Sequence, residues 1–198
     1  MRNLFIICLL AIFSLVQAEV ITLNILSDTT WKSTNTSYAS WATLGFNDSG
    51  WSTADNVNGT TTYSGGYYIW EGARTGTTNN EVFFRKIISF TGTVLSASMV
   101  WVVDDDMEMY INNTQVYRET NGGAESGSMT INPTYFLSSS QNIIAFHTTD
   151  GDLPSPHDQG DQYFAFNITL VVDVPEPSTV LLVGLMLAAY GFFKFRKH

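Results

Sequence analysis

The sequence predicts an all-β fold, a two-sheet β-sandwich of the jelly-roll kind, and three observations lead to this prediction. Thr, Ser, Asn and aromatic residues are abundant, and no long segment has the 3.6-residue period of an amphipathic helix. Short apolar runs recur between clusters of Gly and Asn, which is typical of strands joined by turns. About eight to ten such strands with long loops fit a jelly roll.

Strands in the first half of the body are predicted with unequal strength. Residues 21–26 alternate apolar and polar side chains, which predicts a half-buried first strand. Residues 31–66 are mostly polar and contain weak strands at best. Residues 67–70 form a short aromatic strand, and residues 81–90 form a long one.

The second half contains the strand that we expect at the centre of a sheet. Residues 95–103 place apolar side chains on both faces, as a strand between two neighbours does. We expect residues 107–116 to complete a hairpin around residues 104–106, and the pair Asn112-Asn113 to make a second tight turn with positive φ. Residues 121–127 are expected to be a loop. The last strands are predicted at residues 131–137, 142–148 and 162–172.

The N-terminal residues 1–18 have the parts of a secretory signal peptide. Arg2 precedes an apolar run, and small or branched residues lead to a cleavage point after Ala18. The one cysteine, Cys8, lies in this segment, so the exported body has no disulfide, thiolate metal ligand or cysteine nucleophile. Residues 19–173 then form one domain, which is large enough to bury its own core.

The C-terminal residues 174–198 consist of three parts: Pro175-Glu176-Pro177, an uncharged apolar run at residues 180–193, and the basic residues Lys194, Arg196 and Lys197. The two prolines end any strand before them. A helix over residues 179–193 would rise about 22 Å, less than the roughly 30 Å hydrocarbon core of a bilayer.

This tail resembles the PEP-CTERM sorting signal of exopolysaccharide-producing Gram-negative bacteria. The resemblance implies that Pro175, Glu176 and Pro177 are recognised by an exosortase, that residues 179–193 are a transmembrane helix, and that residues 194–198 are a basic retention tail. It implies export to the cell envelope, the cell surface or the extracellular matrix, with membrane anchoring before processing. A plain tail anchor preceded by a chance Pro-Glu-Pro is the alternative.

The charge of the body excludes one class of partner. Of nine basic residues, Arg2, Lys194, Arg196 and Lys197 lie in the terminal segments, which leaves five against 18 acids between Glu19 and Glu176, a net charge of −13. Such a body repels phosphate backbones, so we expect no nucleic-acid partner.

Four motifs occur in order along the body: Gly45-Phe46-Asn47-Asp48-Ser49-Gly50-Trp51, Phe84-Arg85-Lys86, residues 103–116 and Gln141-Asn142-Ile143-Ile144-Ala145-Phe146. Together they resemble the galactose-binding-like jelly rolls that accompany many β-galactosidases. The resemblance implies this fold and a non-catalytic accessory role. A turn at Asp48 is expected to fold Trp51 back over the edge of the sandwich. The sequence departs from the family at Asn112-Asn113, where Asn-Gly is usual.

Carbohydrate recognition needs aromatic faces for the apolar side of a sugar and fixed polar partners for its hydroxyl groups. Residues of these types in loop-rich stretches are the candidate ligand-binding set, and we expect about half of them to be packing residues instead. The set is Trp31, Trp41, Tyr67, Tyr68, Trp70 and Asn79 or Asn80.

The acidic loops are the candidate sites for cations and for catalysis. A structural Ca²⁺ could be held by Asp104, Asp106, Asp150 and Asp152, because Ca²⁺ prefers several carboxylate oxygens from loops. Solvated loops are the default, and no other cofactor is expected. Neighbouring acids on a strand point to opposite faces, so residues 104–106 with Glu108 are not expected to act as a glycosidase pair.

The sequence therefore predicts an exported, exosortase-sorted bacterial surface or matrix protein. Its body is expected to be a non-catalytic carbohydrate-binding or adhesive module associated with exopolysaccharide and biofilm. The alternatives are a structural matrix component without a specific ligand, and a glycoside hydrolase.

Overall fold

A computed structural model describes residues 19–71, 81–150 and 162–175 of the chain. The chain divides into two units, Thr22–Val172 and the two termini Met1–Ile21 with Asp173–His198. No helix within the described residues has the length and apolar character needed to cross a membrane. Several predicted features lie outside these residues: Ala18, Asn79, Asn80, Asp152, Glu176, Pro177, the membrane segment 179–193 and the tail 194–198.

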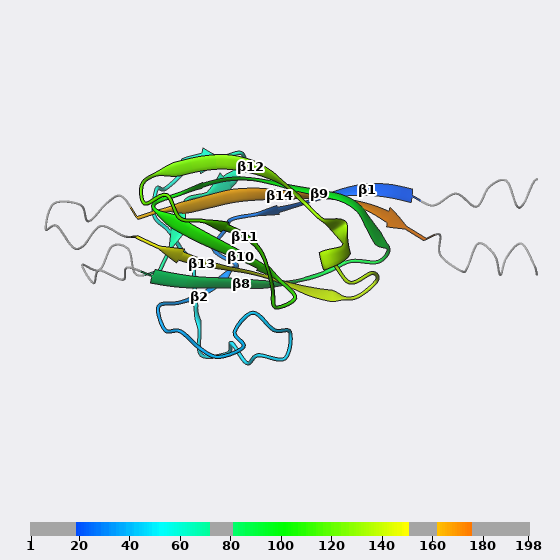
Figure 1. The fold of residues 1–198 in the computed structure, drawn as a ribbon, viewed down its shortest axis with the longest axis horizontal. Helices are drawn as coiled ribbons and strands as arrows, with labels where there is room; N and C mark the ends of the chain where they lie inside the picture. The colour runs from blue at the N-terminus through cyan, green and yellow to red at the C-terminus, as the bar shows by residue number, and fades with distance from the viewer. Residues whose placement is uncertain (1–18, 72–80, 151–161, 176–198) are drawn as a thin grey trace, which may run out of the picture. The chain divides into compact units, whose positions relative to one another are not determined.

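The described residues form an all-β sandwich, as predicted (Figure 1). Sheet A contains, in order, β12 (Glu125–Ile131), β9 (Thr93–Val103), β14 (Phe164–Val174), β7 (Ile69–Trp70) and β4 (Asp55–Asn56), with β1 (Glu19–Leu26) paired to β14. Sheet B contains β11 (Thr114–Glu119), β10 (Asp106–Ile111), β13 (Gln141–Thr149), β8 (Glu81–Ser89), β2 (Lys32–Thr34) and β3 (Ser52–Thr53). A small hairpin pairs β5 (Thr62–Tyr63) with β6 (Gly66–Tyr67), and the 3₁₀ helix η1 spans Pro133–Tyr135.

Aromatic side chains fill the space between the two sheets. Phe146 of sheet B packs on Phe166 of sheet A with ring centroids 4.6 Å apart, and Phe84 packs on Phe164 at 5.9 Å. Trp31 meets Phe166 edge-on at 5.0 Å. All five side chains are completely buried, so the contact between the sheets is the main core of the domain.

The strand pattern confirms the strongest predictions from the sequence. The central strand β9 lies between β12 and β14, with Ala97, Met99, Trp101 and Val103 buried on its inner side. The strands predicted at residues 81–90, 142–148 and 162–172 are present as β8, β13 and β14. Asn112 and Asn113 have φ values of 49° and 68°, the predicted turn conformation.

The predicted hairpin around residues 104–106 is wrong, because β9 belongs to sheet A and β10 to sheet B. The backbone N–H of Asp104 donates to the carbonyl of Tyr163, and that of Asp105 donates to the carbonyl of Thr149. These residues therefore carry the chain from one sheet to the other instead of turning it back within one sheet.

The predicted strand at residues 131–137 is also wrong. β12 ends at Ile131, and the Asn132 side chain accepts a hydrogen bond from the N–H of Thr134 at 3.0 Å, which starts η1 at Pro133. The loop predicted at residues 121–127 is shorter than expected, because β12 begins at Glu125.

Candidate functional site

The loop of residues 35–51 covers the outer face of sheet B, the face turned away from sheet A (Figure 1). Arg85 of β8 holds this loop in place and is completely buried. Its guanidinium forms an ion pair with Asp48, donates to the Thr43 carbonyl at 2.9 Å, and lies 5.3 Å from the centre of the Phe46 ring. One strand residue thus fixes the loop at three points.

The turn before Trp51 differs from the prediction in one detail. The side chain of Asn47, not that of Asp48, accepts the hydrogen bond from the Ser49 N–H at 3.1 Å, while the Trp51 N–H donates to the Asp48 carbonyl at 3.0 Å. The carboxylate of Asp48 is therefore free to pair with Arg85.

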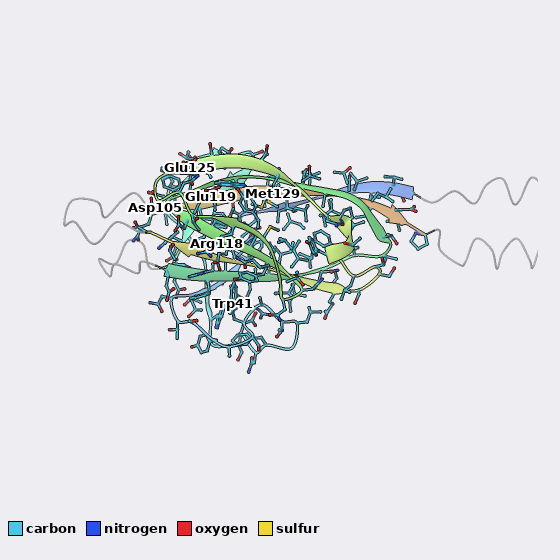
Figure 2. The ribbon with its side chains drawn as sticks, in the orientation of Figure 1. Trp41, Asp105, Arg118, Glu119, Glu125 and Met129 are labelled. Atoms are coloured by element: carbon cyan, nitrogen blue, oxygen red, sulfur yellow. The ribbon has the colours of Figure 1, made fainter. Side chains whose placement is uncertain are left out.

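Trp41 is a half-buried aromatic residue that this loop brings onto sheet B (Figure 2). Its ring meets Phe83 of β8 edge-on at 5.0 Å and Tyr110 of β10 at 5.4 Å, and it stacks on Trp51 with centroids 6.5 Å apart. Three aromatic neighbours fix the indole, while part of its surface stays in contact with solvent.

A row of polar side chains crosses β8, β13 and β10 beside Trp41. His147 Nε2 lies 3.0 Å from Glu81 Oε2, and His147 Nδ1 lies 3.6 Å from Glu108 Oε2. Glu108 also pairs with Arg118 of β11 at 3.3 Å and accepts from the Tyr110 hydroxyl at 2.7 Å. The strand register places these side chains on one face, since Glu108 is opposite both His147 and Arg118.

Phe83 joins the polar row to the aromatic residues. The His147 ring stacks on Phe83 with centroids 4.4 Å apart and an interplanar angle of 4°. We call the whole group the outer-B cluster, and its members are Trp41, Glu81, Phe83, Glu108, Tyr110, Arg118 and His147.

Burial raises the pKa of Tyr110, the hydrogen bond to the Glu108 carboxylate and the charge of that carboxylate act in the same direction, and together they bring it to about 12. Arg118 acts in the opposite sense, with a smaller effect. The phenol is therefore protonated at neutral pH and donates to Glu108, which leaves that carboxylate in a fixed position.

The outer-B cluster has the chemical groups that a sugar site uses. The Trp41 ring supplies an apolar surface, and carboxylate, imidazole and guanidinium groups supply hydrogen-bond donors and acceptors beside it. The imidazole of His147 fills the space between Glu81 and Glu108, so these two carboxylates do not face each other across an open gap.

Two of the sequence candidates are corrected by burial. Trp31 and Trp70 are completely buried and have no ring face to offer a ligand. Trp31 donates its indole N–H to the Leu26 carbonyl at 2.8 Å, and Trp70 packs edge-on against Phe84 at 6.3 Å. Both serve the core, because each ring packs against phenylalanine side chains between the two sheets.

Tyr67 and Tyr68 are not brought to Trp41. Tyr67 is 40% exposed, and its N–H donates to the Ser27 carbonyl beside sheet A. Tyr68 packs edge-on against Tyr163 at 5.3 Å. Of the candidates within the described residues, Trp41 is therefore the one that belongs to the outer-B cluster.

The candidate calcium ligands are placed as follows. Asp106 accepts from the Gly122 N–H at 3.3 Å, and Asp150 accepts from the Gln162 side chain at 2.9 Å. Asp104 lies in the link between β9 and β10. Within the described part of the chain, no three His, Cys, Asp or Glu side chains are grouped as a metal site would need.

Sequence reasoning missed most of the outer-B cluster. Glu108 was considered only with its acidic neighbours, and His147 lies in the predicted strand at residues 142–148, to which no role was given. Glu81, Phe83 and Tyr110 were assigned to strands without a binding role, and Arg118 lies beyond the predicted strand at residues 107–116. The signal that could have found them is the alternation of residues along the strands, which places Glu81 and Phe83, Glu108 and Tyr110 on shared faces.

No family model matches the sequence, and no curated protein is similar to it. Among solved structures, the fold is similar to part of a glycosyl hydrolase family 2 member from Bacteroides cellulosilyticus, with a TM-score of 0.52 and 13% identity over 76% of this chain. A β-glucuronidase from glycoside hydrolase family 2 aligns with a TM-score of 0.49 and 15% identity over 78% of this chain.

The chain spans about a fifth of the length of these enzymes, 21% of the first and 18% of the second. At such low identity the similarity shows the fold alone. The body of this protein is a β-sandwich of the kind found as one domain within family 2 glycoside hydrolases.

Proposed function

We propose that the body is a non-catalytic carbohydrate-binding module and that the outer-B cluster is its ligand site. The observation that carries this proposal is the half-buried Trp41 ring, fixed by three aromatic neighbours beside the row of Glu108, His147 and Glu81. A sugar places its apolar face on such a ring and its hydroxyl groups on such a row.

The network around Glu108 supports binding because it is already ordered. Glu108 is held by Arg118, Tyr110 and His147 before any ligand arrives. A ligand therefore does not have to order these side chains, which reduces the entropy lost on binding.

The charge of the domain favours a neutral glycan over an anionic one. The four basic side chains of the described body all contact acceptors: Lys32 the Trp51 carbonyl, Arg85 the Asp48 carboxylate, Lys86 the Asp28 carboxylate and Arg118 the Glu108 carboxylate. With five basic residues against 18 acids between Glu19 and Glu176, a polyanionic chain is repelled.

The arrangement of the two carboxylates supports binding without hydrolysis. A glycosidase needs a sugar bond between two carboxyl groups, separated by roughly 5 to 10 Å. Here His147 occupies the space between Glu81 and Glu108. The two carboxylates therefore contact the imidazole ring and not a sugar bond.

The same proposal includes export and sorting. The signal-peptide pattern before Ala18 and the Pro175-Glu176-Pro177 tail support delivery by an exosortase to the envelope, the cell surface or an exopolysaccharide matrix. In the producing bacterium, the double change Pro175→Ala and Glu176→Ala is expected to stop processing. Unchanged processing and surface location would leave the tail as a plain anchor.

A glycan screen with the full chain tests the binding proposal. The chain is solubilised in a detergent without a sugar headgroup, and binding is measured by calorimetry with and without Ca²⁺. Trp41→Ala is expected to weaken binding by about ten-fold or more, since a ring contact and its packing are lost. Tyr67→Ala, an exposed aromatic residue beside sheet A, is the matched control and is expected to bind normally.

Two results would contradict the proposal. Binding that Trp41→Ala leaves intact would place the site elsewhere on the molecule. No binding to any sugar, in either buffer, would leave the protein as a structural matrix component without a specific ligand.

A further inference from the structure

A second aromatic ring of the loop of residues 35–51 reaches the solvent. Tyr38 is 44% exposed, although its ring contacts two other aromatic side chains of the loop. Its ring centroid lies 5.7 Å from that of Phe46 and 6.1 Å from that of Trp51. These two contacts fix the ring, while much of its surface stays accessible to a ligand.

Trp51 links Tyr38 to Trp41 of the outer-B cluster. The Trp51 ring is buried, and its centroid lies 6.5 Å from that of Trp41 and 6.1 Å from that of Tyr38. The Trp41 plane is inclined by 26° to the Trp51 plane and the Tyr38 plane by 33°, so neither ring stands edge-on to it. One buried indole thus supports two rings that both reach the solvent.

The backbone and the layer below also hold Tyr38 in place. The N–H and the hydroxyl of Thr43 both donate to the Ser40 carbonyl, at 3.0 and 2.8 Å, which closes the turn after Tyr38. The buried Arg85 guanidinium lies 5.3 Å from the centre of the Phe46 ring, on which Tyr38 packs. The ring is therefore positioned before a ligand arrives, which reduces the entropy lost on binding.

The surroundings of Tyr38 are polar but carry no charge. Residues 35–40 are all exposed, and residues 35–47 include no Asp, Glu, Lys or Arg. Amide and hydroxyl groups can bond to sugar hydroxyl groups without the cost of desolvating an ion. The exposed residues of this kind beside Tyr38 are Asn35, Thr36, Ser37 and Ser40.

Two accessible rings on one loop favour a ligand that presents more than one apolar face. A chain of sugars does so, because every unit repeats an apolar face and a rim of hydroxyl groups. Both rings contact Trp51, so we expect separate sugars of one chain to cover them.

We infer that Tyr38 forms a second sugar subsite, and that the ligand of the outer-B cluster is a chain of several neutral sugars instead of a single terminal sugar. This inference rests on the proposed binding of a glycan at Trp41.

The two subsites differ in what they recognise. Beside Trp41, the carboxylate of Glu108 and the imidazole of His147 are directional hydrogen-bonding groups, so the kind of sugar is selected there. Tyr38 offers mainly a ring face, which stacks on many kinds of sugar. Once one sugar is bound at Trp41, contact with Tyr38 becomes intramolecular and adds affinity for longer chains.

Calorimetry with oligosaccharides of increasing length tests the second subsite. The full chain, in a detergent without a sugar headgroup, is titrated with cello-, manno- and galacto-oligosaccharides, each from the disaccharide to the hexasaccharide. In a series that binds, wild-type affinity is expected to rise about five- to ten-fold with chain length. Tyr38→Ala is expected to abolish this rise and to keep the disaccharide affinity within about two-fold of the wild type.

Two variants control for other roles of Tyr38. Tyr38→Phe keeps the ring and is expected to keep the rise with chain length, because stacking uses the ring and not the hydroxyl. Tyr67→Ala removes a tyrosine of similar exposure, 40%, beside sheet A and is expected to bind like the wild type at every length. Urea unfolding of each variant checks that the domain is folded.

Five results would overturn the inference. They are a wild-type affinity that does not change with chain length, no binding to any of the three series, a rise that Tyr38→Ala retains, a rise that Tyr38→Phe loses, and an equal loss for short and long chains in Tyr38→Ala. The last would mean that Tyr38 only supports Trp51. The first two are measured on the wild type, so they do not depend on the folding of a variant.

Trp41→Ala separates this inference from the proposed function. It is expected to weaken binding at every chain length, the disaccharide included. If it does so while chain length has no effect, the site at Trp41 stands and the subsite at Tyr38 fails. If the wild type binds no sugar at all, both fail.

Discussion

The outer face of sheet B is covered by a loop that a buried arginine holds, whereas on sheet A the outward residues Ser98, Ser126 and Ser128 of β9 and β12 are exposed. Both faces come from strands with the same inward pattern, in which alternate residues enter the core. The difference lies in the outward residues. Sheet B directs Phe83, Arg85 and Tyr110 outward, and these recruit the aromatic loop, while sheet A directs Ser, Thr and Val outward.

This comparison shows that a residue that points outward from a strand need not be exposed to solvent. Arg85, Ile143 and Ala145 point away from sheet A and are nevertheless completely buried, because the loop adds a layer. The outer-B cluster forms at the margin of that layer, where Trp41 and Tyr110 meet the polar row.

The largest loss of stability is expected at Arg85, which holds the loop of residues 35–51. Arg85→Ala removes one partner of a buried ion pair and leaves several acceptors unpaired, so we expect the free energy of unfolding to fall by about 3–5 kcal/mol. Arg118→Ala is the control, since Arg118 is 64% exposed and its pair is expected to contribute less than about 1 kcal/mol. Urea unfolding monitored by tryptophan fluorescence measures both. Equal losses in the two variants would mean that the loop does not depend on Arg85.

A smaller loss of stability is expected at Gly127, where the Trp101 ring leaves little room for a side chain. A Cβ at Gly127 of β12 would lie 2.8 Å from the Trp101 ring, so Gly127→Ala is expected to cost about 1–3 kcal/mol of stability. At Gly123 a Cβ would meet nothing within 4 Å, which makes Gly123→Ala the control. Thermal unfolding compares them. If Gly127→Ala melted like the control, Trp101 would not pack flat against β12.

Alkaline pH is expected to lower the stability of the fold through Tyr110, which lies on the outer face of sheet B. The pKa of Tyr110 is raised in the folded chain to about 12 from an ordinary value of 10, so folding favours the protonated phenol. Its contribution to stability is complete below pH 10 and is lost as the pH rises toward 12. Absorbance of the phenolate band should show a late-titrating tyrosine near pH 12 that is missing in Tyr110→Phe. A titration curve that loses an ordinary tyrosine in this variant would contradict the burial of the phenol.

The smallest loss of stability is expected on the exposed outer side of β12. Ser128→Lys changes an exposed residue that lies on no buried contact, so the free energy of unfolding should change by less than about 0.5 kcal/mol. Ala145→Lys, at a completely buried position of the sheet B outer face, should destabilise the chain severely. Chemical denaturation measures both. Comparable losses would show that something covers the outer side of β12.

The sequence predicts the long, largely apolar strands because each pattern is local. Residues 81–90 and 95–103 are examples, and Asn112-Asn113 specifies its turn through the positive φ that Asn tolerates. Residues 104–106 could not be assigned, since a short acidic link looks the same whether it turns a strand back or carries it to another sheet. The hydrogen bonds that decide this come from Tyr163 and Thr149, which are distant in the sequence.

The candidate site is harder to predict for the same reason. Trp31, Trp41 and Trp70 have similar surroundings in the sequence, but two are buried and one is half-buried. Their exposure depends on which strands pair across the sheets. Glu81, Glu108 and His147 become neighbours only through the register of β8, β13 and β10.

Hydrogen–deuterium exchange of the full chain, with and without the glycan that it binds, tests the central claim most directly. If the outer-B cluster is the site, the glycan should slow exchange in residues 35–51 and in the strands β10 and β13 that carry Tyr110 and His147. Exchange in β12 should be unchanged. Protection confined to sheet A, or absent from the loop that holds Trp41, would contradict the account.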